Sequence, residues 1–224
     1  MAENGRYPRV VTPKGTAIFP RLNSPDTKFK AEGVYEVKLA FDPDTPGLDE
    51  LRRRARAIVD AEYQRVVEKL TSDGKPGLAK KITKSDPFKA EEDPQTGEAT
   101  GRVFIKARMN ASGISKKTGK PWTRRPDIFD ARGNRLARPP LIGGGTELKL
   151  AVELAPYYAA ADKVVGCSFR LEAAQIIRLV SFGERDAGGY GFGAEEGDDL
   201  SDYRSAEQEF GADTVGVDDE DDEL

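Results

Sequence analysis

The sequence of 224 residues contains no histidine and a single cysteine, Cys167. Without histidine there can be no Ser-His or Cys-His nucleophile and no histidine acid-base step near neutral pH. One cysteine excludes an internal disulfide, and with no histidine it cannot supply the four soft ligands of a structural zinc site. An enzyme built from this chain would depend on carboxylate chemistry, usually with magnesium.

Long apolar runs are also missing. No segment approaches the ~18 consecutive apolar residues of a membrane span. The first residues, MAENGRYPRVV, lack the basic-then-apolar pattern of a secretory signal. The lone cysteine fits a reducing compartment. We therefore expect a cytoplasmic protein that does not bind a membrane.

Charge, in contrast, is abundant and unevenly distributed. Charged residues make up 33 % of the chain, and the net charge of −4 conceals two opposite regions. Residues 1–183 contain 33 basic and 23 acidic residues, whereas residues 184–224 contain two basic and 16 acidic ones. The segment 102–138 alone has 11 lysines and arginines against two aspartates. The sequence therefore divides into a basic body and an acidic tail.

The tail begins with the glycine-aromatic tract GGYGFG and ends in VDDEDDEL. Its dense like charge and few aliphatic residues cannot offset the entropy of ordering, so we expect residues 184–224 to be disordered. One interpretation is a solubilising tail. The other is a tail that competes for the basic surface of the body and recruits partners. The residues expected to bind partners are Asp218, Asp219, Glu220, Asp221, Asp222, Glu223 and Leu224.

The basic body alternates strand-like runs with loops. Residues 16–22, 34–41 and 147–154 have the period-two pattern of strands. A longer strand-rich run covers 164–182, and its alternation slips near 173–175, which indicates a β-bulge. These runs, with two more described below, predict five or six strands.

One helix is predicted at 48–70, where apolar residues recur at helical spacing. Thr45 is the expected N-cap, with Pro46 at the first helical position. The glycine-, proline-, lysine- and glutamate-rich stretch 71–101 is expected to be a mobile loop. A helix between early strands predicts a mainly β fold, an OB-like barrel of five to six strands with one inserted α-helix.

The strand RVFIKARM (102–109) has one apolar face, which suits a core, and one face that carries a ring among cations. We predict that it forms a β-hairpin with 120–129. The partner strand places Trp122, the only tryptophan, between Lys120 and Arg124 on one face. Each strand would thus present an aromatic ring flanked by cations.

This combination suits single-stranded nucleic acid, because unpaired bases stack on rings while lysine and arginine contact phosphates. Alternatively, Trp122 closes the barrel end and Phe104 covers an inserted segment, while their cations extend into solvent. Four residues outside the hairpin could form a second site. The candidate binding residues are Arg102, Phe104, Lys106, Arg108, Lys116, Lys117, Lys120, Trp122, Arg124, Arg125, Arg132 and Arg135, with Phe19, Arg21, Tyr157 and Tyr158 for the second site.

Carboxylates before the tail leave one enzymatic alternative, a magnesium-dependent nuclease or other nucleic-acid-processing enzyme. Its candidate ligands, Asp86, Glu91, Glu92 and Asp93, lie in a loop without strand anchoring. The run GGGTELK lacks the spacing of a phosphate-binding loop and indicates a glycine turn before a strand. We expect a binding protein, not an enzyme, with no cofactor and no metal.

These residues resemble the single-stranded DNA-binding proteins of tailed bacteriophages. The likeness rests on GTAIFPRL, GVYEVKLAF, the inserted helix, RVFIKARMNASGISKKTGKPW and the terminal VDDEDDEL. It implies an OB-fold body with an acidic C-terminal tail that coats single-stranded DNA without sequence preference during phage replication and recombination in the host cytoplasm.

The resemblance also implies that the tail contacts a replicative polymerase or helicase. Tails in this group often end in an aromatic residue, whereas this one ends in Leu224. Some relatives are dimers, so a homodimer stays open. The number of nucleotides bound and the preference for DNA or RNA also stay open.

Overall fold

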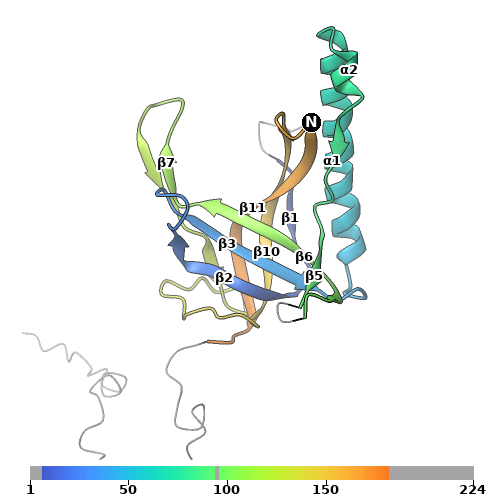
Figure 1. Ribbon diagram of the computed structural model, residues 1–224. Helices are drawn as coiled ribbons and strands as arrows, with labels where there is room; N and C mark the ends of the chain where they lie inside the picture. The colour runs from blue at the N-terminus through green and yellow to red at the C-terminus, as the bar shows by residue number, and fades with distance from the viewer. Residues whose placement is uncertain (1–6, 94–95, 182–224) are drawn as a thin grey trace, which may run out of the picture. The chain divides into compact units, whose positions relative to one another are not determined.

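The computed structural model describes residues 7–93 and 96–181, and the predicted acidic tail lies outside them. Along these residues three strands come first, two consecutive helices follow, and the other strands come after them (Figure 1). Their bounds are β1 Arg9–Val11, β2 Gly15–Asp26, β3 Val34–Phe41, α1 Leu48–Ser72, α2 Pro76–Ala79, β4 Thr83–Lys84, β5 Lys89–Glu92, β6 Ala99–Asn110, β7 Ser112–Ile114, β8 Pro121–Thr123, β9 Asp127–Phe129, β10 Glu147–Ala159 and β11 Val164–Arg178.

Five strands close into a ring. β2 pairs with β3, β3 with β6, β6 in parallel with β11, and β11 with β10, which returns to β2. The long helix α1 packs beside β10 and β11 (Figure 1). The predicted class, a mainly β barrel with one long helix, is confirmed. No helix within residues 7–93 and 96–181 is both long enough and apolar enough to span a bilayer.

The core lies inside the ring and under α1. Alternate side chains of β10, such as Leu148, Leu150 and Val152, are fully buried, and α1 adds Leu51 and Val59 from one of its faces. Strand alternation therefore assigns one face of each ring strand to the core and leaves the other face outside. The bulge expected near 173–175 lies one residue earlier, where β11 has an extra residue between the partners of Ala151 and Val152.

The helix prediction holds except at its start. α1 begins at Leu48 as predicted, but its N-cap is Gly47 rather than Thr45. Gly47 has φ +86°, a left-handed conformation that glycine adopts without steric cost. Thr45 instead closes a turn, in which its carbonyl accepts the Leu48 N–H at 3.1 Å.

The stretch 71–101 is not a simple loop. It contains α2, β4, β5 and the start of β6. β4 and β5 are short strands that pair with β11 and β6 respectively. Neither has an alternating apolar pattern, because both lie at the margin of the sheet with exposed side chains. The sequence of this stretch therefore has no periodic pattern that predicts strands.

The predicted hairpin between 102–109 and 120–129 is wrong. β6 has β3 on one edge and both β5 and β11 on the other, so neither edge is free for 120–129. The chain leaves the sheet after Asn110, and β7 and β8 form a separate two-stranded ribbon that we call the arm. Pro126, which has no N–H to donate, precedes β9, and β9 pairs with β11.

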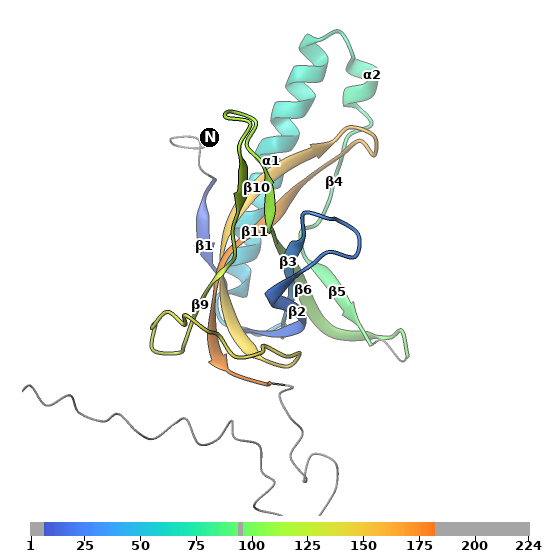
Figure 2. The ribbon, with the colours of Figure 1, turned by 90° about the vertical axis from the view of Figure 1, so that its left-hand side faces the viewer.

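The arm and the β10–β11 hairpin project from the same side of the ring. Both extend upward in Figure 1, and the second view in Figure 2 agrees.

Candidate nucleic-acid interface

A row of six charged residues crosses the outer surface of the strands, because the strand registers place each residue opposite the next. Four are arginines and two are glutamates, so the row is net positive. We call it the charged row. In register order it consists of Arg9 on β1, Glu153 on β10, Arg170 on β11, Arg108 on β6, Glu36 on β3 and Arg21 on β2.

A groove of about 1020 Å³ lies over the middle of this row. It extends from Asn110 and Arg124, at the base of the arm, to Tyr157, near the β10–β11 turn. The outer faces of β6 and β11 contribute most of its remaining side chains. These include Phe104, Lys106 and Arg108 from β6 and Ser168, Arg170 and Glu172 from β11, with Lys89 from β5.

Like charges lie directly opposite one another on this outer face. Lys38 of β3 is in register with Lys106 of β6, and Arg108 of β6 is in register with Arg170 of β11. Like charges directly opposite on neighbouring strands destabilise a sheet. The folded protein tolerates this repulsion at the place where the groove lies.

Carboxylates partly neutralise the groove. Glu36 accepts Lys106 Nζ at 2.9 Å and Arg108 Nε at 3.1 Å, so one carboxylate holds two cations. At the other end of the row, Arg9 contacts Glu172 at 2.6 Å and Glu153 at 3.6 Å. The glutamates and Lys106 are half-buried and the two arginines are exposed, so water still screens these pairs and each contributes only about 0.2–1 kcal/mol.

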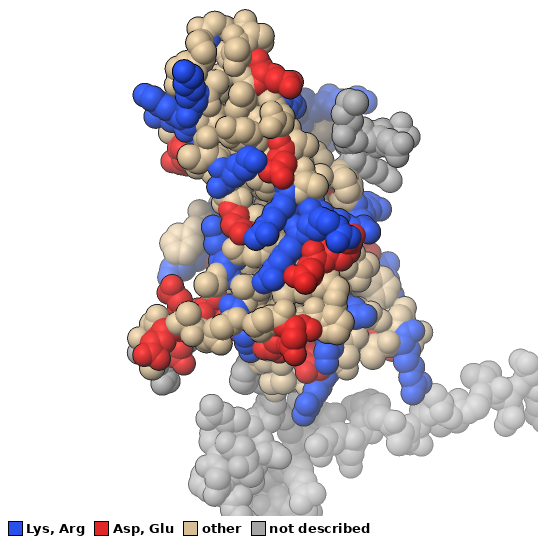
Figure 3. Space-filling view, turned by 90° about the vertical axis from the view of Figure 1, so that its right-hand side faces the viewer, with Lys and Arg blue, Asp and Glu red and all other residues tan. Residues whose placement is uncertain are grey.

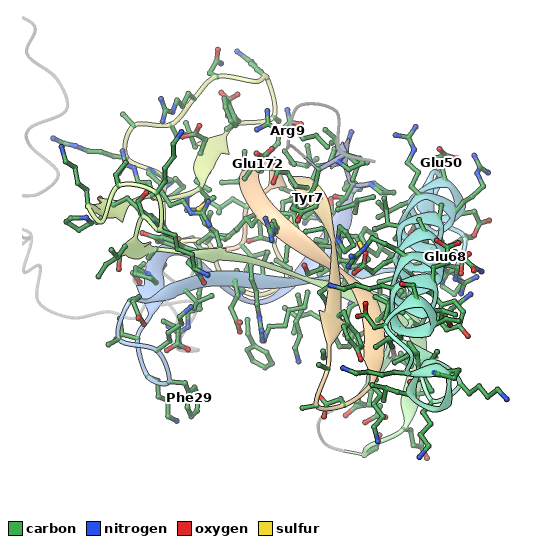
Figure 4. The ribbon with its side chains drawn as sticks, turned by 90° about the horizontal axis from the view of Figure 1, so that it is seen from above. Tyr7, Arg9, Phe29, Glu50, Glu68 and Glu172 are labelled. Atoms are coloured by element: carbon green, nitrogen blue, oxygen red, sulfur yellow. The ribbon has the colours of Figure 1, made fainter. Side chains whose placement is uncertain are left out.

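Arg170 is held by an aromatic ring instead. Its guanidinium lies 4.7 Å from the centre of the Tyr7 ring, and Tyr7, Arg9 and Glu172 lie close together in Figure 4. Within the described residues no carboxylate forms an ion pair with Arg170. Its charge is therefore available to an anion in the groove.

Both rings singled out in the sequence lie outside the core. Phe104 is half-buried on the outer face of β6, with Lys38 Nζ 5.1 Å from its ring centre. Trp122 is half-buried on the arm, packed over Gly113, where a Cβ atom would come within 2.7 Å of the indole. The Arg124 guanidinium lies 5.0 Å from the Trp122 ring and also reaches the groove. Trp122 thus does not close the barrel end.

The groove brings together five of the predicted residues: Phe104, Lys106, Arg108, Arg124 and Tyr157. Arg21 lies at the far end of the charged row. Phe19, beside it on β2, is 75 % exposed at an irregularity of the strand, with φ +47°. Tyr158 points the other way from Tyr157 and packs against the core.

The other predicted cations lie elsewhere. Lys116, Lys117 and Lys120 are exposed around the tip of the arm. Arg102 forms an ion pair with Glu91 at 2.7 Å, on the β5 side of β6.

The last three, Arg125, Arg132 and Arg135, lie around β9. Arg125 and Arg135 line a separate small cavity, where Arg135 pairs with Asp127. Arg132 lies in a turn closed by hydrogen bonds to the Asp130 carboxylate, chiefly from the Asn134 side chain and backbone, and these lower the pKa of Asp130.

The sequence analysis missed Arg9, Lys38, Lys89 and Arg170, which lie in the groove or on the outer face. The alternation of VYEVKLAF already puts Lys38 opposite the core face, as does that of SFRLE for Arg170. The alternation of a strand does not predict which other strand pairs with it. The parallel contact of β11 with β6 places Arg170 beside Arg108, and nothing local to either strand encodes it.

Two of the four carboxylates of the nuclease alternative form ion pairs with arginines. Asp86 pairs with Arg56 at 3.1 Å, and Glu91 with Arg102. In the part of the chain that the structure describes, no cluster of three or more acidic or cysteine side chains is placed to hold a metal ion. Cys167 borders the groove but is buried, which raises the pKa of its thiol to about 12 and keeps it protonated near neutral pH.

An OB-like ring whose outer-face groove carries basic and aromatic side chains is typical of proteins that bind single-stranded nucleic acid. The family model described as "Single-stranded DNA-binding protein, Bacteriophage T7" matches residues 15–181. The chain therefore belongs to the T7-type family of phage single-stranded DNA-binding proteins, a family of binding proteins and not of enzymes.

Individual relatives agree with this family. The chain is 24 % identical over 151 residues to the single-stranded DNA-binding protein of Escherichia phage T7 and 25 % identical over 158 residues to that of Enterobacteria phage T3. Each match covers 67 % of this chain and 64 % of the relative. The crystal structure of gp2.5 from bacteriophage T7 is similar in fold, with a TM-score of 0.64 and 23 % identity over 86 % of this chain and 98 % of that one.

Proposed function

We propose that this protein binds single-stranded DNA without sequence preference, in the groove on the outer face of the ring, during phage DNA replication and recombination in the host cytoplasm. One observation carries this proposal. Two pairs of like charges, Lys38–Lys106 and Arg108–Arg170, lie directly opposite each other on neighbouring strands, near the ring of Phe104. A bound polyanion relieves that repulsion, and its unpaired bases stack on the aromatic rings.

The two kinds of side chain have separate tasks. Phe104 and Tyr157 offer flat apolar faces on which unpaired bases stack, each for about 1–3 kcal/mol. Lys106, Arg108 and Arg170 contact the phosphates, whose spacing does not depend on sequence. In duplex DNA the bases are already stacked on one another, so the rings contribute little there. The groove therefore favours single strands over duplex.

Titration of poly-dT and of duplex DNA, followed by Trp122 fluorescence, tests the proposal. Because the chain has one tryptophan, on the arm beside Arg124, we expect quenching as a strand leaves the groove across the arm. Log affinity should fall with log salt at about −0.7 per phosphate contact. Duplex binding as tight as poly-dT binding would refute the proposal, and binding without quenching would place the arm outside the path.

Glu36 limits the affinity of the groove, because it competes with phosphate for Lys106 and Arg108. We expect Glu36→Gln to tighten poly-dT binding by up to about fivefold at low salt, the equivalent of an exposed ion pair. Glu50→Gln is the matched control: Glu50 pairs with Arg53 and Arg54 on α1 and lies apart from Glu172 in Figure 4. Weaker binding by Glu36→Gln would mean that Glu36 orients the cations rather than competing.

The acidic tail is proposed to compete for the same groove and, once displaced by DNA, to recruit a polymerase or helicase. Removing residues 184–224 should tighten DNA binding about tenfold at low salt. This value follows if the tethered tail has an effective concentration of about 1 mM and binds the groove with a dissociation constant of about 0.1 mM. The effect should fade as salt rises. A control chain with a neutral tail of equal length should behave like the truncation. Unchanged affinity after truncation would refute the competition.

A further inference from the structure

The loop between β2 and β3, residues 27–33, carries an aromatic side chain that the sequence analysis did not single out. Phe29 is 89 % exposed, more than any other large apolar residue that the structure describes. Figure 4 shows it at the tip of the loop, projecting away from the barrel. Lys28 Nζ lies 5.2 Å from its ring centre. No carboxylate occurs between residues 27 and 31.

The loop is tied to the end of the groove. Lys30 Nζ donates to Asn110 Oδ1 at 3.2 Å, and Asn110 lines the groove. Ser112 Oγ donates to the Glu32 carbonyl at 2.8 Å, so the loop is also bonded to the first strand of the arm. Gly33, with φ +74°, leaves no room for a Cβ, which would lie 2.9 Å from the Pro25 ring. None of these contacts involves the Phe29 side chain.

Three of the six cation–ring pairs in the described residues lie in the groove, on the arm and on this loop, which meet at Asn110. Lys38 lies over Phe104 in the groove, Arg124 over Trp122 on the arm, and Lys28 over Phe29 on the loop. The backbone carbonyl of Asn110 accepts Arg124 Nε at 2.9 Å while its side chain accepts Lys30. A single exposed phenylalanine is ordinary on a protein surface. Its place on a loop that is bonded to a groove residue, with Lys28 over its ring, favours a binding role.

We propose that Phe29 stacks on a base of the DNA strand beyond the end of the groove, while Lys28 and Lys30 contact the adjoining phosphates. This inference rests on the proposed function of the groove. It makes the β2–β3 loop a distal subsite, occupied only when the strand is long enough to pass Asn110. Short strands would fill the groove alone.

A length series of oligo-dT, from about 4 to about 16 nucleotides, tests the subsite across the range of site sizes of OB folds. The affinity of Phe29→Ala for the shortest strands should equal that of the unchanged protein. For the longest strands it should be weaker by about fivefold or more, the loss of one stacked base. Phe29→Trp should retain the gain with length, whereas Phe29→Leu, apolar without a flat π face, should lose it.

Val11→Ala is the control, because Val11 is 67 % exposed on β1 and lies outside the groove. If Phe29→Ala follows the unchanged protein at every length, while Phe104→Ala is weakened at every length, the subsite is refuted and the groove stands. If Phe29→Ala is equally weak at all lengths, the distal position is wrong. A change only in the sedimentation of the free protein would assign Phe29 to contact between copies. If the unchanged protein binds no strand of any length, the proposed function itself fails.

Discussion

Replacing Arg108 and Arg170 together by alanine is expected to weaken binding of single-stranded DNA about a hundredfold. The two side chains lie in register on neighbouring strands in the middle of the charged row, and both reach the groove. A hydrogen bond to a charged group contributes about 1.5–3 kcal/mol, and two such losses exceed two tenfold steps. The variant loses the Arg108–Glu36 pair and the Arg170–Tyr7 contact, but it also loses the repulsion between the two arginines, so we expect it to remain folded.

The salt dependence distinguishes this loss from general damage. Each lost phosphate contact should reduce the slope of log affinity against log salt by about 0.7, so the double variant should lose about 1.4. Fluorescence anisotropy with labelled oligo-dT at several salt concentrations measures both quantities. The matched control is Arg53→Ala with Arg54→Ala on α1, whose face in Figure 3 mixes basic and acidic side chains. An equal loss in that control would contradict the assignment of the groove.

Replacing both Phe104 and Tyr157 by alanine should weaken binding without changing its salt dependence, in contrast to the arginine variant. We expect affinity to fall at least about thirtyfold, from two stacked bases at about 1–3 kcal/mol each, with the salt slope unchanged. Tyr157 packs over Gly166, where a Cβ atom would come within 2.4 Å of its ring, so this ring is held in place by its neighbour strand. Phe104→Leu serves as the control for packing, because it keeps an apolar side chain at this position of β6 but removes the flat π face.

The double ring variant must be folded for its affinity to be informative. Circular dichroism melts of the variant and of Phe104→Leu should be similar, because both rings lie outside the core. A lower salt slope in the ring variant would mean that its lysines and arginines make fewer phosphate contacts. That result would contradict the proposal that the rings bind bases and the cations bind phosphates independently.

Local pattern predicted much of this fold. The alternation of VYEVKLAF gave β3 at its observed bounds, and that of RVFIKARM gave the correct outer face of β6. The helix was predicted to begin at Leu48, where α1 begins. In each case one face of an element is buried, so hydrophobic period alone determines the assignment.

What failed depends on long-range pairing. Nothing in residues 120–129 shows that both edges of β6 are already occupied, so the predicted hairpin placed Trp122 beside Phe104. Trp122 belongs to the arm and Phe104 to the large sheet. Arg124 connects the two, because its side chain lies over the Trp122 ring and also lines the groove. Phe29 was missed because its loop has no period, and only its bond to Asn110 through Lys30 places it near the site.

Photo-crosslinking is the most direct test of the central claim, that single-stranded DNA lies across the outer face of β6, β10 and β11. Oligo-dT bearing a photoreactive thymine analogue would be irradiated with the full-length protein, and the attached peptides identified by mass spectrometry. We predict attachment at Phe104 and Tyr157. Attachment confined to α1, for example at Tyr63 beside Lys84, would contradict it.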